Sequence, residues 1–168
     1  MTDRELIDFL GIAEKMKCNT RHSWTSTNRK ESVAEHSWRL SLIALLLERE
    51  IENVDFQKII KMCIIHDLGE AITILIEKLP EPQKTDMFTL FEEMERRETI
   101  ESKIYKALDR LEAVIQHNEA PIDSWLPLEY ELQQSYGWEE AQVHERLSQL
   151  RQTAKQDTID KIKRESKQ

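Results

Sequence analysis

The chain has very few residues that interrupt helices: only three glycines and four prolines in 168 residues. Strand-rich folds need many tight turns, which depend on glycine, proline and asparagine. Apolar residues instead recur at intervals of three and four, the spacing of one face of a helix. We therefore predict an all-α fold with no strand series. A chain of this length fits one domain.

Cysteines and long apolar runs are also scarce. Cys18 and Cys63 have no CxxC spacing, and we see no secretory leader, so we expect a reducing, cytoplasmic location. The longest apolar candidates, 40–47 and 71–76, are far shorter than the roughly 18 residues needed to cross a bilayer. We expect a soluble protein with no membrane partner.

Positive charge is in deficit, since 24 Lys and Arg face 32 Asp and Glu, for a net charge of −8. This balance argues against a nucleic-acid polymer as partner, because such binding depends on clustered Lys and Arg. Any anionic substrate should be small. Arg21, Arg29 and Lys30 form a locally basic segment, which could bind a small phosphate or be an ordinary solvated loop.

Helix boundaries can be predicted from capping residues. Ser32 and Glu35 form a capping box, which predicts a helix over about 33–50 with His36 on its core-facing side. Asp55 can cap the next helix. Further helices are predicted over about 56–78, over 85–118 with a break near Arg97 or Thr99, and from about Val143 to Ile159, with a loop over 118–128.

The dipeptide His66-Asp67, after the apolar run 62–65, is the strongest chemical signal. An imidazole and a carboxylate suit the same borderline divalent metals. Placing both in a helix interior costs several kcal/mol unless a metal or partner compensates. Glu70 lies one helical turn after His66 and could orient or deprotonate a metal-bound water.

These residues resemble the signature of the HD-domain phosphohydrolases: a histidine, an adjacent His-Asp pair and a later aspartate. In this chain they are His36, His66, Asp67 and Asp109. The segments ESVAEHS, IHDLGE and KALD are similar to those of the 5′-deoxynucleotidase branch. The resemblance covers about residues 5–120 and implies that these four residues bind a metal.

The resemblance further implies a compact HD-domain helical bundle that holds one divalent ion (Co, Mn, Zn, Fe or Mg). It implies a homodimer that hydrolyses the phosphomonoester of nucleoside 5′-monophosphates, preferably deoxynucleotides, or of another small phosphate monoester. In that branch an arginine binds the phosphate with a tryptophan nearby, and Arg21 and Trp24 are the candidates, with Arg29 as an alternative. We treat 1–168 as one domain, with its core over about 5–120 and a C-terminal helical extension over about 121–165.

One segment departs from the family pattern. Where a Gly-Asp pair usually presents a carboxylate to the substrate, this chain has Ile74 and Leu75, so Leu75 takes the predicted substrate-facing position. Two alternatives therefore stay open: a metal-binding HD protein with weak or no catalysis that acts as a ligand-binding or interaction module, and a di-iron HD-type oxygenase. The oxygenase would need further histidines. We expect His117 to be a polar helix-end residue, His22 and His144 to lie on the surface, and Cys63 to pack as a small apolar side chain.

Overall fold

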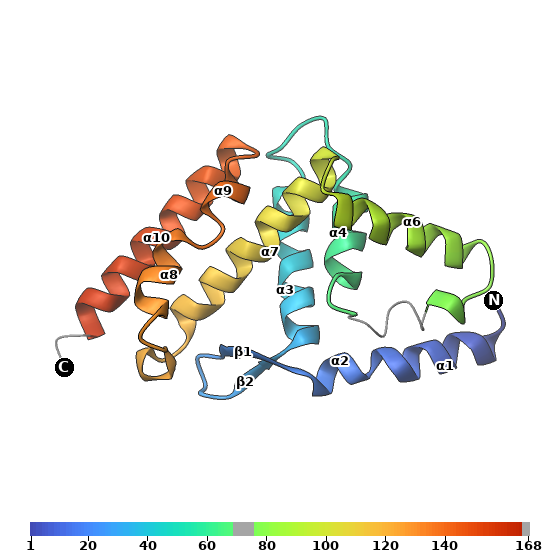
Figure 1. Ribbon diagram of the computed structural model, residues 1–168, viewed down its shortest axis with the longest axis horizontal. Coiled ribbons are helices and arrows are strands. Elements are labelled where there is room, and N and C mark those ends of the chain that lie inside the picture. Colours follow the sequence, from blue (N-terminus) through green and yellow to red (C-terminus); the bar gives the residue numbers. More distant parts are fainter. Residues whose placement is uncertain (69–75, 166–168) are drawn as a thin grey trace.

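Helices make up most of the structure, a computed structural model that describes residues 1–68 and 76–165 (Figure 1). This confirms the predicted all-α class. None of the described helices is long and apolar enough to span a membrane. In chain order the helices are α1 (Asp3–Ala13), α2 (Lys15–Cys18), α3 (Val33–Leu47), α4 (Phe56–Ile65), α6 (Gln83–Arg96), α7 (Ile100–Glu119), the 3₁₀ turn η1 (Ile122–Ser124), α8 (Glu129–Ser135), α9 (Trp138–Ala141) and α10 (Glu145–Glu165).

A small antiparallel hairpin that was not predicted lies between α2 and α3. Strand β1 (Thr20–Trp24) pairs with β2 (Lys30–Ser32). The connecting turn contains Asn28 at φ 60°, and a backbone hydrogen bond of 2.8 Å joins Thr25 to Arg29. Asparagine tolerates this left-handed conformation without a glycine. The turn therefore lacks the glycine signal by which hairpins are usually recognised.

The two helix starts predicted from the capping residues Ser32 and Asp55 are confirmed. Ser32 Oγ accepts a hydrogen bond from the Glu35 N–H, and the Glu35 carboxylate accepts one from the Ser32 N–H at 2.9 Å, so the capping box begins α3. Asp55 Oδ1 accepts from the Lys58 N–H at 3.0 Å at the start of α4. Local sequence is sufficient here because donor and acceptor lie three residues apart.

The end of α4 differs from the prediction. The helix ends at Ile65, and His66, Asp67 and Leu68 lie in a turn rather than in a helix interior. In this turn the Leu68 N–H donates to the Ile65 carbonyl, three residues back, at 3.1 Å. The tighter turn moves His66 and Asp67 to the end of the helix. The rest of the helix predicted over 56–78 falls largely on residues outside those described.

The helix predicted over 85–118 is interrupted where the sequence indicates. Arg97 adopts a left-handed conformation (φ 53°) after α6, and Thr99 caps α7 by accepting from the Ser102 N–H. The short helices α8 and α9 were not predicted. Gly137 separates them at φ 71°, where a Cβ would lie 2.5 Å from Arg110 Cβ, so glycine is required.

The core is formed where α3, α4 and α7 pack together, and α10 lies along α7 with α8 and α9 (Figure 1). The hairpin lies beside the N-terminal end of α3 and contacts α7. This packing places the first turn of α3, the end of α4 and the middle of α7 around the same region. Fully buried apolar side chains at the centre include Leu40 and Ala44 of α3, Ile59 and Met62 of α4, and Ile104 and Leu108 of α7.

Candidate metal centre

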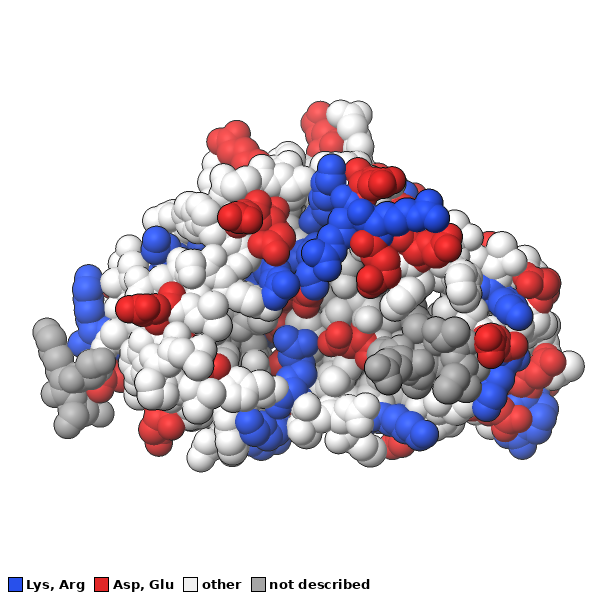
Figure 2. Space-filling view, in the orientation of Figure 1, with Lys and Arg blue, Asp and Glu red and all other residues white. Residues whose placement is uncertain are grey.

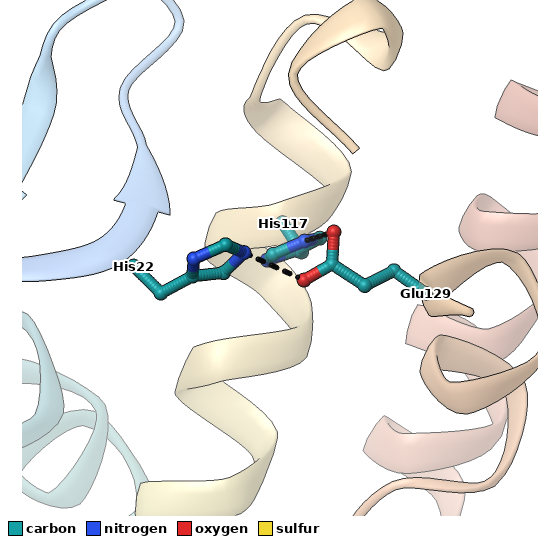
Figure 3. A group of neighbouring side chains, drawn as sticks. All are labelled: His22, His117 and Glu129. Atoms are coloured by element: carbon teal, nitrogen blue, oxygen red, sulfur yellow. Dashed lines mark hydrogen bonds and ion pairs between the residues drawn. The ribbon is translucent and has the colours of Figure 1, made fainter. Parts of the chain in front are cut away.

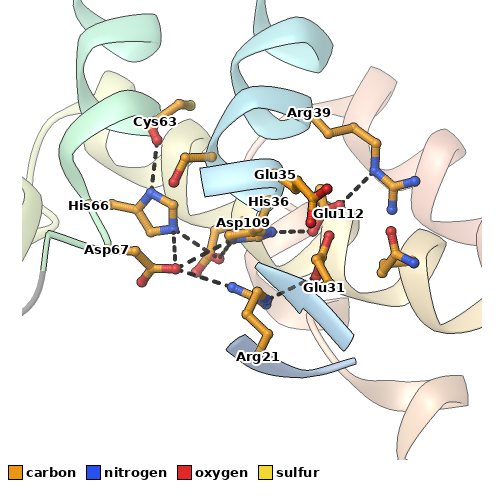
Figure 4. Close-up of polar contacts among 12 residues, drawn as sticks. Arg21, Glu31, Glu35, His36, Arg39, Cys63, His66, Asp67, Asp109 and Glu112 are labelled. Atoms are coloured by element: carbon orange, nitrogen blue, oxygen red, sulfur yellow. Dashed lines mark hydrogen bonds and ion pairs between the residues drawn. The ribbon is translucent and has the colours of Figure 1, made fainter. Parts of the chain in front are cut away.

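Four side chains from three elements converge on one region (Figure 4). His36 comes from the first turn of α3, His66 and Asp67 from the turn after α4, and Asp109 from the middle of α7. Nε2 of His36 lies 3.2 Å from Asp109 Oδ1 and 4.0 Å from Asp67 Oδ2. Nε2 of His66 lies 3.2 Å from Asp67 Oδ2 and 3.8 Å from Asp109 Oδ1. The structure thus brings together the four side chains that the sequence singles out.

The orientation of the His66 ring fits a metal ligand. Its Nδ1 lies 2.8 Å from the Cys63 carbonyl oxygen, which only accepts, so Nδ1 carries a proton and, in the neutral ring, Nε2 has a free lone pair. This buried Nε2 has no hydrogen-bond partner among residues 1–68 and 76–165. It faces the carboxylates of Asp67 and Asp109. A lone pair facing two carboxylates is unfavourable unless a proton or a metal cation lies between them.

The other histidine is held by a carboxylate that the sequence analysis did not select. Glu112 is fully buried and accepts a hydrogen bond from His36 Nδ1, and it also accepts from Arg39 Nε at 2.7 Å. The bond to Nδ1 leaves His36 Nε2 directed at Asp109. Carboxylates commonly orient metal-binding histidines in this way. The sequence signal that could have identified Glu112 is its position on the apolar face of α7, three residues after Asp109.

The pKa values of these groups follow from their contacts. Burial lowers the pKa of His36, but hydrogen bonds with Asp109 and Glu112 outweigh it and raise the pKa to about 9. Burial raises the pKa of Asp109, but His36 and Lys106 more than offset this and leave it below its usual value. The pKa of Asp67 is also lowered, because its 3.2 Å contact with His66 and the nearby positive charges outweigh burial. Both aspartates are therefore ionised at neutral pH, the form that binds metals.

Arg21 extends from β1 to the same cluster. Its Nη1 donates to Asp67 Oδ2 at 3.2 Å, and its Nε lies 3.2 Å from Glu31 Oε2. Glu31 is buried, and burial together with the nearby Glu112 charge raises its pKa to about 7. Arg29, the alternative phosphate ligand, instead pairs with Glu35 at the surface at 2.5 Å. Of the two arginines, the structure brings Arg21 to the cluster.

The remaining predicted site residues have different outcomes. The Trp24 ring lies under Lys30 Nζ at 4.4 Å, and the Trp24 carbonyl accepts from Gln116 at 2.6 Å. Its predicted role in substrate binding stays a prediction. Glu70, Ile74 and Leu75 lie outside the described residues.

The observed burial of Cys63 and of the three remaining histidines can be compared with the predictions. Cys63 is fully buried, as predicted, and burial raises the pKa of its thiol. His144 is half-buried and caps α10 by accepting from the Arg146 N–H at 3.1 Å. His22 is exposed, as predicted. His117 does lie in the last turn of α7, but it is buried there, with only 6% of its surface exposed.

Acidic residues outnumber Lys and Arg in the chain, 32 to 24. Figure 2 shows basic side chains near the centre of one face with acidic side chains close around them. On this face, side chains of both charges are therefore interspersed.

The helical fold and the paired His-Asp cluster together define a protein of the HD type, and comparison with known proteins agrees. The sequence profile of the family described as "HD domain" matches residues 13–74 and 71–151. The chain therefore belongs to the HD-domain family.

Its similarity extends to curated relatives. The human protein named 5′-deoxynucleotidase HDDC2 is 26% identical over 141 residues, which cover 69% of this chain and 68% of that protein. The zebrafish (Danio rerio) protein of the same name is 29% identical over 139 residues, covering 68% of each.

A solved structure has the same fold. The crystal structure of a protein described as a predicted metal-dependent phosphohydrolase, from Magnetospirillum magnetotacticum, superimposes with a TM-score of 0.80 at 23% identity. The match covers 94% of this chain and 95% of the other. It confirms the expected HD-domain helical bundle.

Proposed function

We propose that this protein is a metal-dependent phosphohydrolase that releases phosphate from nucleoside 5′-monophosphates, with deoxynucleotides as preferred substrates. The observation that carries the proposal is the convergence of His36, His66, Asp67 and Asp109 with the lone pair of His66 Nε2 directed into the cluster. The names of the curated relatives, all 5′-deoxynucleotidases, support the choice of substrate.

The ligand set would consist of two imidazoles, through Nε2, and two carboxylates. Mixed nitrogen and oxygen donors suit Zn, Co, Mn and Fe better than Mg. Such an ion, when bound, lowers the pKa of a water molecule and polarises a phosphoryl oxygen. Lys106 Nζ contacts Asp109 Oδ2 at 2.6 Å, which directs the other oxygen, Oδ1, at His36.

Arg21 is proposed to bind the phosphate. Its guanidinium touches Asp67, one of the four proposed ligands, so a phosphate bound to Arg21 would lie beside the ion. A planar guanidinium can make two parallel hydrogen bonds to a phosphate. The contacts with Glu31 and Asp67 hold the group in position before substrate arrives. Because it is preorganised, little conformational freedom is lost on binding.

Glu70 is proposed to orient or deprotonate the attacking water. The proposal rests on its spacing of four residues from His66 in the sequence. A positioned carboxylate of this kind accelerates proton transfer by about 10²–10⁴-fold. Trp24 and Leu75 are proposed as further substrate contacts, on the family resemblance alone.

The test is a screen of purified, metal-loaded protein against ribo- and deoxynucleoside 5′-monophosphates, with released phosphate as the readout. Nucleoside 3′-monophosphates serve as matched substrates of the same charge. We expect turnover of the 5′-esters and loss of both metal and turnover in Asp67→Ala. A metal-loaded preparation that releases no phosphate from any monophosphate would refute the proposal and favour the binding-module alternative.

A further inference from the structure

A second group of potential metal ligands lies outside the candidate metal centre (Figure 3). It consists of His22 on β1, His117 in the last turn of α7, and Glu129 at the first position of α8. His22 Nε2 lies 2.9 Å from Glu129 Oε1, and His117 Nε2 lies 3.2 Å from Glu129 Oε2. None of the three belongs to the four-residue cluster described above. Tertiary folding alone brings them together, since 107 residues separate His22 from Glu129.

The donor atoms have the arrangement expected of a zinc-type site. Both imidazoles direct the same nitrogen, Nε2, at one carboxylate, and Figure 3 shows the two rings on the same side of Glu129. Two histidines and one carboxylate form a ligand set that zinc commonly uses, with water in the remaining position. The His22 side chain is 53% exposed, so water can reach that position.

Two of the three side chains are held rigidly by their surroundings. Glu129 is buried, and its Oε2 accepts from the Leu126 N–H at 2.6 Å. His117 packs against the Trp125 ring, and the Trp125 indole N–H donates to the His117 carbonyl at 3.1 Å. Burial lowers the pKa of His117 despite its bond with Glu129, so the ring is neutral at neutral pH, as a metal ligand must be. Glu129 and His117 are therefore preorganised to bind a metal.

We propose that His22, His117 and Glu129 bind a second divalent cation of the zinc class, with solvent completing its coordination. The ion would join β1 to α7 and α8. Because His22 follows Arg21 in β1, it would also fix the strand that carries the proposed phosphate ligand. The site would then stabilise the fold and hold Arg21 in place without itself contacting substrate.

The competing explanation is a hydrogen-bonded cluster without a metal. Glu129 could accept an N–H from each ring, and both contacts have hydrogen-bond length. Lys30 Nζ, which donates to the His22 carbonyl at 2.7 Å, also adds a positive charge nearby that disfavours a cation. The substitution His22→Gln separates the two explanations, since glutamine keeps an N–H donor for Glu129 but is a poor zinc ligand.

The experiment measures zinc per chain by elemental analysis after chelator treatment, reloading with zinc and desalting. We expect about two equivalents in the wild type and about one in each of His22→Gln and Asp67→Ala, because each variant removes one site. The double variant should bind none. His144→Gln, which alters a histidine outside both groups, is the matched control and should bind as the wild type does.

A second readout is the shift in melting temperature on adding zinc. It should persist in Asp67→Ala and disappear in the double variant, because a ligand stabilises only the folded state that binds it. Equal zinc content in the wild type and His22→Gln would overturn the proposal. So would a folded Asp67→Ala protein, verified by circular dichroism, that binds no zinc. Should Asp67→Ala not fold, the single His22→Gln comparison decides. Phosphate release is not part of either readout, so failure of the proposed function would be seen separately.

Discussion

Replacing Glu112 with glutamine tests whether this buried carboxylate sets the metal affinity of His36. In the structure Glu112 binds the Nδ1 proton of His36 and the Nε of Arg39. Glutamine keeps the shape but has no charge, and its amide N–H₂ cannot accept from either donor. One of the two contacts must therefore be lost. We expect the His36 ring to be held less firmly and to be a weaker ligand.

The magnitude follows from these contacts. Loss of a carboxylate behind a metal-binding histidine typically costs about 10–100-fold in affinity, or roughly 1.4–2.7 kcal/mol. Removing one partner of a buried ion pair costs about 3–5 kcal/mol of folding stability. We expect the lower end of that range, because Arg39 keeps a second partner, Glu119, at 2.5 Å.

The assay is a competitive titration against a chelator of known affinity, combined with thermal unfolding. Glu112 helps to raise the pKa of His36 to about 9, so its loss also weakens proton competition at neutral pH. The titration is therefore repeated near the upper pH limit of protein stability, where that effect is smallest. Glu119→Gln is the matched control, since Glu119 is the exposed partner of the same arginine. Wild-type metal affinity in Glu112→Gln at both pH values would refute the reasoning.

Three further predictions concern the substrate, the water and pH. Arg21→Lys should raise KM for a monophosphate about tenfold or more with little change in metal content. Arg29→Lys alters a surface ion pair and should leave KM unchanged. The reverse result in steady-state kinetics would reassign the phosphate ligand to Arg29. Glu70→Ala should retain metal but lose about 10²-fold in phosphate release, and unchanged turnover would remove Glu70 from the mechanism. Burial raises the pKa of Glu101, but bonds from the Asp55 N–H and Lys58 leave it lowered. The stabilisation by ionised Glu101 should therefore be complete above the pKa of the unfolded state and be lost as pH falls through the pKa of the folded state. Denaturant unfolding should show wild type about 1 kcal/mol more stable than Glu101→Gln at neutral pH. This difference should vanish in acid.

The sequence by itself determined the features that depend on neighbouring residues. The capping box of Ser32 and Glu35 begins α3, and Asp55 caps α4, because each bond spans only three residues. Helical periodicity places Cys63 on a buried face. The His66-Asp67 pair and its motif were also visible, since ligands of this type are recognised by residue type and order. The break between α6 and α7 near Arg97 was predicted as well.

Only the tertiary structure decided which distant side chains meet. Glu112 is an acid on the apolar face of α7, but its partner, His36, lies 76 residues earlier and was identified only by the packing. The sequence favoured Arg21 as the phosphate ligand but left Arg29 as an alternative, and the hairpin brings the first to Asp67 while the second remains at the surface. His117 looked like an ordinary helix-end residue until α8 placed Glu129 beside it. Local patterns specify hydrogen bonds within one or two helical turns, whereas these contacts arise only when packing of the apolar faces fixes how the helices lie against one another.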